Sequence, residues 1–478
     1  MNNYHPRLLL LPLLILAGCA TTVVTPQHEE SAGNAMSQQV ADQIGLYQDP
    51  ELSSYVDAVG QRLARELGAT PYTFHFAIVD QAEPNAFASP GGYIYVSRGL
   101  LAQFNSEAEL AGVLAHEISH VTQRHHTRQA GRSLGAGLLT LPGRAVGIVS
   151  QDLGNIINAP IEFAGQVYLS SFSRGQETEA DEYGTRLAAA AGYDPAQLAV
   201  ALQGIETSIY LLTGQQHKAT FFDTHPTTPT RVADVKRLAA GLSVADRPPL
   251  ATRDQFYGHL DGLWWGPQNP QQGVFHGETF RNADMDFTVN FPSKWKTINT
   301  PRFVGATEPE GGGYLALGGS EGEYTPTEYG AALRQKMQEQ TGLKPTIDRS
   351  FEIGSWPAHA VRYDDTSGKE TVSLYYVFVQ SPRESYTFMA MGLAQHRDTM
   401  RKAVMSLRQM RPAERKLVGG QRLRLADLQP GESIKTMGTR VGNQWSPGLT
   451  AAMNGVTTSN PRLAGEAIKF VRPETYAP

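Results

Sequence analysis

Apolar residues recur at helical spacing in the first half of the chain. After Asp49-Pro50, a pair typical of a helix start, they follow one another at intervals of three or four until Gly68. This stripe predicts a helix with one buried face. Its members are Leu52, Tyr55, Val56, Val59, Leu63 and Leu67.

Further elements follow from the same kind of pattern. Alternating apolar and polar residues predict strands over 73–79 and 91–97, with a turn before the second. Ser106 followed by Glu109 is typical of a capped helix start. Three more helices are expected, over 176–191, after Asp194-Pro195 and over 229–241. The helix after Ser106 directs these residues toward a core: Leu110, Val113, Leu114 and Ile118.

The pattern changes after two prolines at 248 and 249. A linker is expected over 248–274, and then short alternating runs dominate, interrupted by helical patterns at 326–340 and 397–410. We therefore predict an α+β domain of unknown role over 275–414. The remaining residues, 415–478, form a small terminal module.

The start of the chain has the composition of an export signal. A short polar segment ends in Arg7, an apolar run covers 8–16, and Leu-Ala-Gly precedes Cys19. This string resembles a bacterial lipoprotein signal. The resemblance implies removal of residues 1–18 as a signal peptide and lipidation of Cys19, with 19–39 as a polar tether. An ordinary cleaved signal that leaves a free cysteine is the alternative.

Composition and charge exclude several classes of protein. The 478 residues carry 41 Lys+Arg and 46 Asp+Glu, a net charge of −5, without a basic run, so nucleic acid is not an expected partner. A single cysteine excludes an intramolecular disulfide and a cysteine-built metal site. Any metal must therefore be bound by histidine and carboxylate side chains.

The sequence His-Glu-Ile-Ser-His at 116–120 carries candidate chemistry. On a helix, His116 and His120 are one turn apart on the same face, about 6 Å from each other, so both can bind one ion. Glu117 lies beside them and can take a proton from a zinc-activated water. A helix with two surface histidines is the alternative.

Two histidines leave a catalytic zinc site short of one protein ligand, which another element must supply. Glu177 is the candidate, and Asp181 lies one helical turn further on the same face. Taken alone, these acids are better explained as a solvated helix start stabilised by the helix dipole.

A resemblance to a known family favours the ligand role of Glu177 over a solvated helix start. Several ordered motifs between about residues 40 and 240 resemble the HtpX and CAAX-protease zinc metallopeptidase family, peptidase family forty-eight, in particular its soluble periplasmic, BepA-like lipoprotein branch. The motifs are Asn-Ala-Phe-Ala at 85–88, Pro-Gly-Gly-Tyr-Ile at 90–94, the histidine motif at 116–120, Ser-Arg at 173–174 and Glu-Thr-Glu-Ala-Asp at 177–181.

The resemblance implies a mainly α-helical, zincin-like metalloprotease domain over 40–247 with a small edge-strand sheet. It implies one zinc ion on His116, His120 and Glu177. Glu117 is then the general base, and Asp181 is a proton donor or a group behind the ligands.

A loop His-Pro of this branch matches His225-Pro226. His225 is therefore expected as a displaceable fourth ligand that keeps the enzyme latent or as a group that stabilises the oxyanion, with a plain loop histidine as the alternative. The resemblance also implies an exposed edge strand that binds the substrate backbone, with broad specificity. Its residues are Gly91, Gly92, Tyr93, Ile94 and Tyr95.

Two other segments lead to open alternatives. Residues 134–172, rich in Gly, Ala and Leu, are expected to form an apolar flap or a membrane-surface contact, or else a buried pair of helices. The terminal module resembles a LysM-like module, which implies peptidoglycan binding, although a Trp-Ser-Pro-Gly insertion at 445–448 departs from that pattern. A β-rich cap is its alternative. The α+β segment weakly resembles a photosystem-associated and Mog-type fold.

Two functions are consistent with these features. The first is a zinc endopeptidase, a hydrolase lipid-anchored on the periplasmic side of the outer membrane, which degrades misfolded or unassembled envelope proteins in protein quality control. The second is a largely latent, zinc-stabilised binding or chaperone factor for outer-membrane protein assembly. The natural substrate, the activating signal and the oligomeric state do not follow from the sequence.

Overall fold

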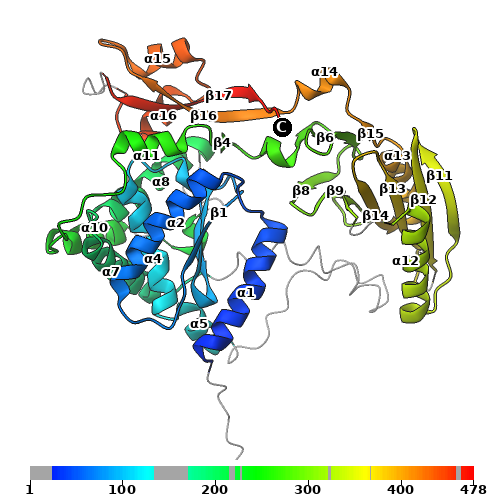
Figure 1. Ribbon diagram of the computed structural model, residues 1–478, viewed down its shortest axis with the longest axis horizontal. Coiled ribbons are helices and arrows are strands. Elements are labelled where there is room, and N and C mark those ends of the chain that lie inside the picture. The colour runs from blue at the N-terminus through cyan, green and yellow to red at the C-terminus, as the bar shows by residue number, and fades with distance from the viewer. Residues whose placement is uncertain are drawn as a thin grey trace, which may run out of the picture.

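Two kinds of architecture follow one another along the chain, a helical N-terminal region and a sheet-rich C-terminal part (Figure 1). A computed structural model describes residues 24–133, 171–214, 221–226, 229–320, 324–366, 368–458 and 465–478. The signal peptide, Cys19 and nearly all of the segment at 134–172 lie outside these residues.

The helical region contains the elements that hold the candidate site. The predicted capping is observed, since Asp49 accepts a hydrogen bond from the Leu52 amide and Ser106 accepts one from the Glu109 amide. The elements are α1 (Pro26–Gln43), α2 (Pro50–Ala64), η1 (Arg65–Leu67), β1 (His75–Val79), β2 (Ala86–Ser89), η2 (Pro90–Gly92), β3 (Tyr93–Ser97), α3 (Arg98–Leu101), α4 (Glu107–Thr122), α5 (His125–Ser133), α7 (Arg174–Ala190), α8 (Gln197–Thr213), α9 (Phe221–Thr224), α10 (Pro229–Ala240) and α11 (Arg253–Leu260).

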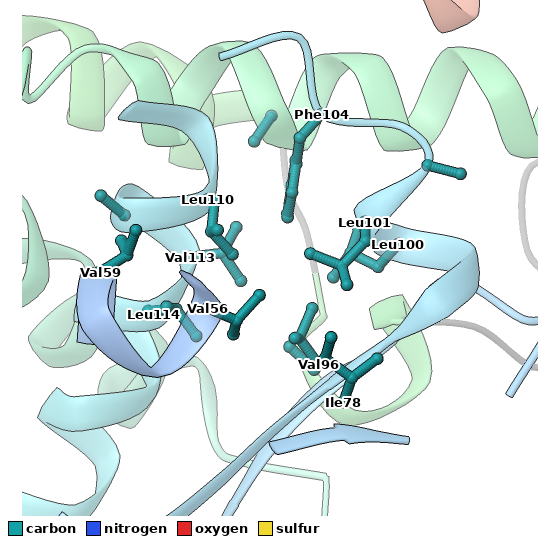
Figure 2. Close-up of a cluster of buried hydrophobic side chains, with 14 of the residues drawn as sticks. Val56, Val59, Ile78, Val96, Leu100, Leu101, Phe104, Leu110, Val113 and Leu114 are labelled. Carbon is teal, nitrogen blue, oxygen red and sulfur yellow. The ribbon is translucent and has the colours of Figure 1, made fainter. Parts of the chain in front are cut away.

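The core of this region lies between α2, α4 and the inner face of the small sheet. Figure 2 shows Val56 and Val59 of α2 beside Leu110, Val113 and Leu114 of α4. All five side chains are buried, as the helical spacing predicted. This packing fixes α4, which carries the histidine motif.

The sheet corrects one prediction. Its strand order is β1-β3-β2, so Tyr93–Ser97 is the central strand, parallel to β1 and antiparallel to β2. Gly91 to Tyr95 therefore do not form an exposed edge, and Gly91 and Gly92 belong to the turn η2. Strand β2, Ala86–Ser89, lies at the end of the sheet instead and packs against α4. Local alternation predicts a strand, but strand order depends on contacts between distant segments.

The predicted tether is also different from a loose chain. From Pro26 on it forms α1, which covers the outer face of the small sheet through Val40, Tyr93 and Tyr95. Gly33 of α1 packs so closely on η2 that an added Cβ would lie 2.1 Å from the Pro90 carbonyl oxygen. The helix is mostly polar because only this narrow side is covered, which explains why no apolar stripe predicts it.

The expected linker at 248–274 is ordered and belongs to the first core. Phe256, Tyr257 and Leu260 of α11 are buried in the same cluster as α2 and α4. Trp264 of β4 (Trp264–Trp265) joins that cluster too. The prolines at 248 and 249 end a helical pattern, but they do not end the domain.

The α+β domain is built around a seven-stranded antiparallel sheet with the order β11-β12-β13-β14-β10-β9-β8. Helix α12 packs on β12 and β13, and a four-stranded sheet of order β15-β7-β6-β5 lies beside the large one (Figure 1). The elements are η5 (Pro270–Gln272), β5 (Val274–His276), β6 (Thr279–Asn282), β7 (Phe287–Asn290), β8 (Lys296–Asn299), β9 (Phe303–Thr307), β10 (Gly313–Gly319), α12 (Pro326–Thr341), β11 (Ile347–Ile353), β12 (Trp356–Asp365), β13 (Val372–Gln380), β14 (Ser385–Leu393), η6 (Ala394–His396), α13 (Arg397–Val404), β15 (Arg408–Gln409) and α14 (Pro412–Arg415).

The terminal segment has the order strand, helix, helix, strand. Its elements are β16 (Gly419–Asp427), α15 (Ile434–Val441), α16 (Pro447–Met453) and β17 (Ala467–Thr475). It does not pack as a separate module, because β16 pairs with β4 and Leu423, Trp445 and Val471 belong to the core of the helical region. In Figure 1 this unit lies along the helical region rather than beyond the α+β domain.

Among the described residues, no helix combines the length and the apolar character that crossing a membrane requires.

Candidate metal centre

Two helices bring the predicted ligands together. Helix α4 supplies His116 and His120, and α7 supplies Glu177 and Asp181. The two helices approach closely because residue 184 is glycine, where an added Cβ would lie 2.8 Å from the His116 amide nitrogen. A larger side chain at this position would separate the histidines from the carboxylates.

Four side chains converge with one possible ligand atom each: His116, His120, Glu177 and His225. These atoms all lie within 4.8 Å of one another, and every residue of the group is buried. The His120 and His116 Nε2 atoms are 3.0 Å apart, and Glu177 Oε1 is 3.5 Å from His120 Nε2. Glu177, whose ligand role the resemblance implied, thus lies within reach of both histidines of the motif.

His225 follows the short helix α9 and reaches the same group from a third direction. Its Nδ1 lies 3.3 Å from His116 Nε2 and 3.1 Å from Glu177 Oε1. Its ring stacks on Phe221 with a centroid distance of 4.5 Å, and its side chain is fully buried. The alternative of a plain loop histidine does not fit this position.

Glu117 lies beside the group and has an unusual environment. Both carboxylate oxygens are buried and have no hydrogen-bond partner among the described residues, although His225 Nε2 is 3.4 Å from Oε1. Burial raises the pKa of Glu117, since it disfavours the charged carboxylate. A carboxylate so placed is able to accept a proton from a molecule that enters the group.

Asp181 lies behind His116 rather than among the four converging atoms. Its Oδ1 is 3.0 Å from His116 Nδ1, and Arg231 Nε donates to its Oδ2 at 2.6 Å. Burial alone would raise the pKa of Asp181, but Arg231 and His116 together outweigh burial and lower the pKa. An aspartate held in its charged form by an arginine is a poor proton donor, so this position favours the second of its two predicted roles.

The charges of Glu177 and His116 also shift each other's pKa. Burial opposes charge on Glu177, but His225 and His116 outweigh it and hold the pKa of Glu177 well below its usual range. Burial likewise lowers the pKa of His116, whereas Asp181 and Glu177 together raise that pKa to about 9. The carboxylates and imidazoles therefore attract one another strongly. Such an arrangement is typical of side chains that bind one cation together.

Sequence reasoning missed two residues at this centre. Arg231 on α10 is buried and its Nη1 lies 2.7 Å from Glu177 Oε2, while its Nε binds Asp181. His125, just after α4, places its Nδ1 2.7 Å from His120 Nδ1. The signal for Arg231 is its position six residues after His225, but no general spacing rule assigns a role to it.

The residues present fit a zinc ion. Three imidazoles and one carboxylate are the ligand types that zinc prefers, and they come from separate elements of a rigid core. The unpaired oxygens of Glu117 next to them indicate that a further polar species belongs in the group.

The residues predicted to bind substrate lie on both sides of the small sheet. Pro90 and Gly91 line a small cavity with His120, whereas Tyr93 and Tyr95 pack toward α1. Ile94 is fully buried in the core below the sheet. Only the turn at Gly91 therefore lies close to the metal-binding group.

Comparisons with known proteins agree with this geometry. Residues 50–239 match the family described as Peptidase family M48. The chain is 29% identical to the beta-barrel assembly-enhancing protease of Yersinia pestis over 54% of this chain and 53% of that protein. It is 24% identical to the metalloprotease LoiP of Escherichia coli strain K12 over 47% of this chain and 94% of that one. The chain spans about half or less of the length of the first curated relatives that it matches.

Several solved structures each match a part of the chain. Cyanobacterial PsbP from Synechocystis, with 11% identity and a TM-score of 0.24, covers 29% of this chain and 95% of its own. A similarity at this level does not define the fold of the α+β domain, so the resemblance predicted for that domain stays a prediction.

Proposed function

Residues 50–239 belong to peptidase family M48, and from this premise we propose that the protein is a zinc-dependent endopeptidase acting on misfolded or unassembled proteins of the cell envelope. The observation that carries the proposal is the buried group of His116, His120, Glu177 and His225, with the unpaired carboxylate of Glu117 beside it.

The chemistry of peptide hydrolysis divides among these residues. His116, His120 and Glu177 would hold a zinc ion, which would act as a Lewis acid that lowers the pKa of a bound water and polarises a carbonyl. Glu117 takes a proton from the attacking water and passes it to the leaving amine, because its buried carboxylate has an affinity for protons above that of an exposed one. Asp181 and Arg231 hold His116 and Glu177 in place.

Substrate binding through the backbone supports action on many sequences. Strand β2 is at the end of the small sheet and lies against α4, so an extended chain could add to it beside the metal-binding group. This moves the proposed binding edge from the predicted Gly91–Tyr95 to Ala86–Ser89. Main-chain hydrogen bonds do not depend on side chains, and unfolded proteins are therefore suitable substrates.

The start of the chain and the names of the relatives support the proposed location. Lipidation of Cys19 would hold the protein on the periplasmic side of the outer membrane by acyl chains alone. The related protease of Yersinia pestis is named for assembly of beta-barrels, which is consistent with envelope proteins as substrates.

Removal and return of the metal test this proposal. Purified protein is treated with a chelator, dialysed, and assayed on casein before and after addition of one equivalent of zinc. We expect cleavage to vanish with the metal and to return with it. Undiminished cleavage by zinc-free protein would refute a zinc peptidase.

His225 is proposed as the fourth ligand that keeps the enzyme latent. It is within contact distance of both His116 and Glu117, where substrate and water must enter. Because catalysis needs an open coordination position, the segment after α9 has to move. His225→Ala should keep zinc and raise basal cleavage, whereas a lower rate at full zinc would support the competing role at the oxyanion.

The second candidate is a largely latent binding or chaperone factor for outer-membrane protein assembly. The closeness of His225 to Glu117 favours it, since a permanently closed centre would hydrolyse little. Expression of Glu117→Gln in an envelope-defective strain separates the two functions. Full rescue by this variant would favour binding, and absence of rescue would favour hydrolysis.

For the terminal unit, residues 415–478, we propose that it binds peptidoglycan. The order strand, helix, helix, strand of a LysM-like unit supports this binding. Sedimentation of the full protein with purified peptidoglycan tests it, and protein that stays in the supernatant would favour the alternative of a cap on the helical region.

A further inference from the structure

We infer that His125 and Glu179 form a positioning relay that fixes the proton of the metal ligand His120, and so presents its Nε2 lone pair to zinc. The inference rests on the proposed zinc site. His125 and Glu179 belong neither to the ligands nor to the residues that meet substrate. Their proposed effect is on how well the site binds its metal.

The relay begins at the two ring nitrogens of His120. The Nε2 atom faces the metal-binding group, 3.0 Å from His116 Nε2 and 3.5 Å from Glu177 Oε1. The Nδ1 atom points the other way and lies 2.7 Å from His125 Nδ1. Two ring nitrogens at this distance form a good hydrogen bond only when one of them carries a proton and the other does not.

The far end of His125 decides which nitrogen carries the proton. His125 Nε2 lies 3.1 Å from Glu179 Oε2, and Arg128 Nη2 donates to the same oxygen at 2.7 Å. An ionised carboxylate only accepts hydrogen bonds, so a neutral His125 carries its single ring proton on Nε2. Its Nδ1 is then an acceptor, His120 must donate from Nδ1, and the lone pair of His120 is left on Nε2.

The protein holds this arrangement rigidly. His125 is fully buried, and Gln176 Nε2 donates to its carbonyl oxygen at 3.1 Å. Phe172 stacks on the His120 ring with a centroid distance of 3.9 Å and an interplanar angle of 19°. The His120 ring cannot turn without losing its stacking on Phe172, the Gln176 bond holds the backbone of His125, and turning the His125 ring would break its contacts with His120 and Glu179. The orientation seen here is thus a property of the fold around α4 and α7.

The two histidines of the motif are therefore supported in different ways. His116 Nδ1 faces the carboxylate of Asp181 directly, at 3.0 Å. His120 reaches the carboxylate of Glu179 only through the ring of His125. Partners behind metal-binding histidines usually contribute about 10–100-fold to metal affinity, because they fix the tautomer and the orientation of the ring.

Zinc affinity is the readout, measured by competition with a chelating dye on the full protein at constant pH. We expect His125→Ala to weaken zinc binding by about 10–100-fold. His125→Asn should recover part of this loss, since its amide can accept from His120 and donate to Glu179. Glu179→Ala should weaken binding less, because Glu179 is partly exposed and water can replace it.

Glu182→Ala is the matched control. It removes the same charge from the same helix, but Glu182 is exposed and pairs only with Arg186 among the contacts described for it. We expect its zinc affinity to equal that of the wild type. Glu179→Ala keeps the test valid if His125→Ala fails to fold, because its side chain is 31% exposed.

The outcomes separate this inference from the proposed function. Wild-type zinc affinity in folded His125→Ala or in Glu179→Ala would overturn the relay and leave the zinc site intact. Weakened affinity in both, with an unchanged control, supports the relay even if the protein does not cleave casein. A wild-type protein that binds no zinc would overturn both.

Discussion

Two of the buried glutamates of helix α4, Glu107 near its start and Glu117 toward its end, have opposite environments. At its start, Glu107 accepts four hydrogen bonds of 2.7–2.8 Å, from the hydroxyls of Tyr55 and Tyr193 and from the amides of Leu250 and Ala251. Toward its other end, Glu117 is equally buried but accepts none from the described residues.

The difference shows how structural and chemical carboxylates can be told apart. Burying a carboxylate without partners costs several kcal/mol, so a protein retains one only where something else needs it. Glu107 ties together α2, the turn after α7 and the segment before α11, and has no capacity left for a ligand. The carboxylate of Glu117 keeps its capacity to accept hydrogen bonds, and it lies next to four side chains that are able to bind a metal.

The largest expected effect is on the metal-binding side. His116→Ala removes one of the proposed ligands, so zinc affinity should fall by more than ~10²-fold and casein cleavage should be lost with it. Metal analysis of the purified variant checks this. Unchanged zinc content in both His116→Ala and Glu177→Ala would refute the site, because neither residue would then bind the metal.

At the start of α4, we expect a loss of stability without a loss of zinc affinity. Glu107→Ala leaves two buried hydroxyls and two backbone amides without their acceptor, and should lower the free energy of unfolding by about 3 kcal/mol. Denaturant unfolding measures the loss. Folded protein should keep its zinc affinity, and a selective loss of zinc without loss of stability would break the comparison.

A smaller loss in the free energy of unfolding is expected from a change in the terminal unit, which contacts the same end of α4. Lys469 of β17 is fully buried and donates to the carbonyl oxygens of Ala102 and Phe104, just before the helix. Lys469→Met should cost about 2 kcal/mol because both acceptors stay buried.

A double-mutant cycle with Glu109 tests whether Lys469 acts partly through its charge. The charge of Glu109 interacts with that of Lys469, so Glu109→Gln combined with Lys469→Met should cost less than the two single changes added together. Strict additivity in denaturant unfolding would show that the two groups do not interact.

The smallest effect concerns a buried glutamate outside α4, Glu29 of α1. Tyr72 donates to it at 2.6 Å, and Arg124 and Thr127 also bind it. Burial opposes its charge, but these partners outweigh burial and lower its pKa.

Because the folded state lowers the pKa of Glu29, its contribution to stability is present above the usual glutamate pKa and is lost as the pH falls through the lowered value. We expect the protection of α1 amides against hydrogen exchange, relative to the intrinsic exchange rate at each pH, to fall below about pH 4.5 in the wild type. In Glu29→Gln this protection should be lower already at neutral pH and change little with acid. The same pH dependence in both proteins would exclude Glu29 as the cause.

The parts of the molecule that the sequence predicted well depend on neighbouring residues. The stripe from Leu52 to Leu63 and the cap at Ser106 are local signals, and the four-residue spacing of His116 and His120 is enough to place both on one face. The helix with Glu177 was also predicted, although its ligand role came from a resemblance rather than from spacing.

The parts that were missed depend on contacts between distant segments. Strand order made Tyr93–Ser97 central instead of an edge, and no local pattern encodes that order. Lys469 reaches Ala102 across 367 residues, so the terminal unit could not be recognised as a part of the first core. His125 and Arg231 are polar residues whose roles become visible only through their partners.

The central claim is that Glu117 acts as the base beside a zinc ion. It is tested most directly by the cleavage rate of Glu117→Gln, compared with wild type at equal measured zinc content. The substitution keeps the shape of the side chain and removes the carboxylate, so we predict full zinc, unchanged or higher stability and at least a ~10²-fold slower cleavage of casein. Cleavage at a near wild-type rate by the zinc-loaded variant would contradict the mechanism.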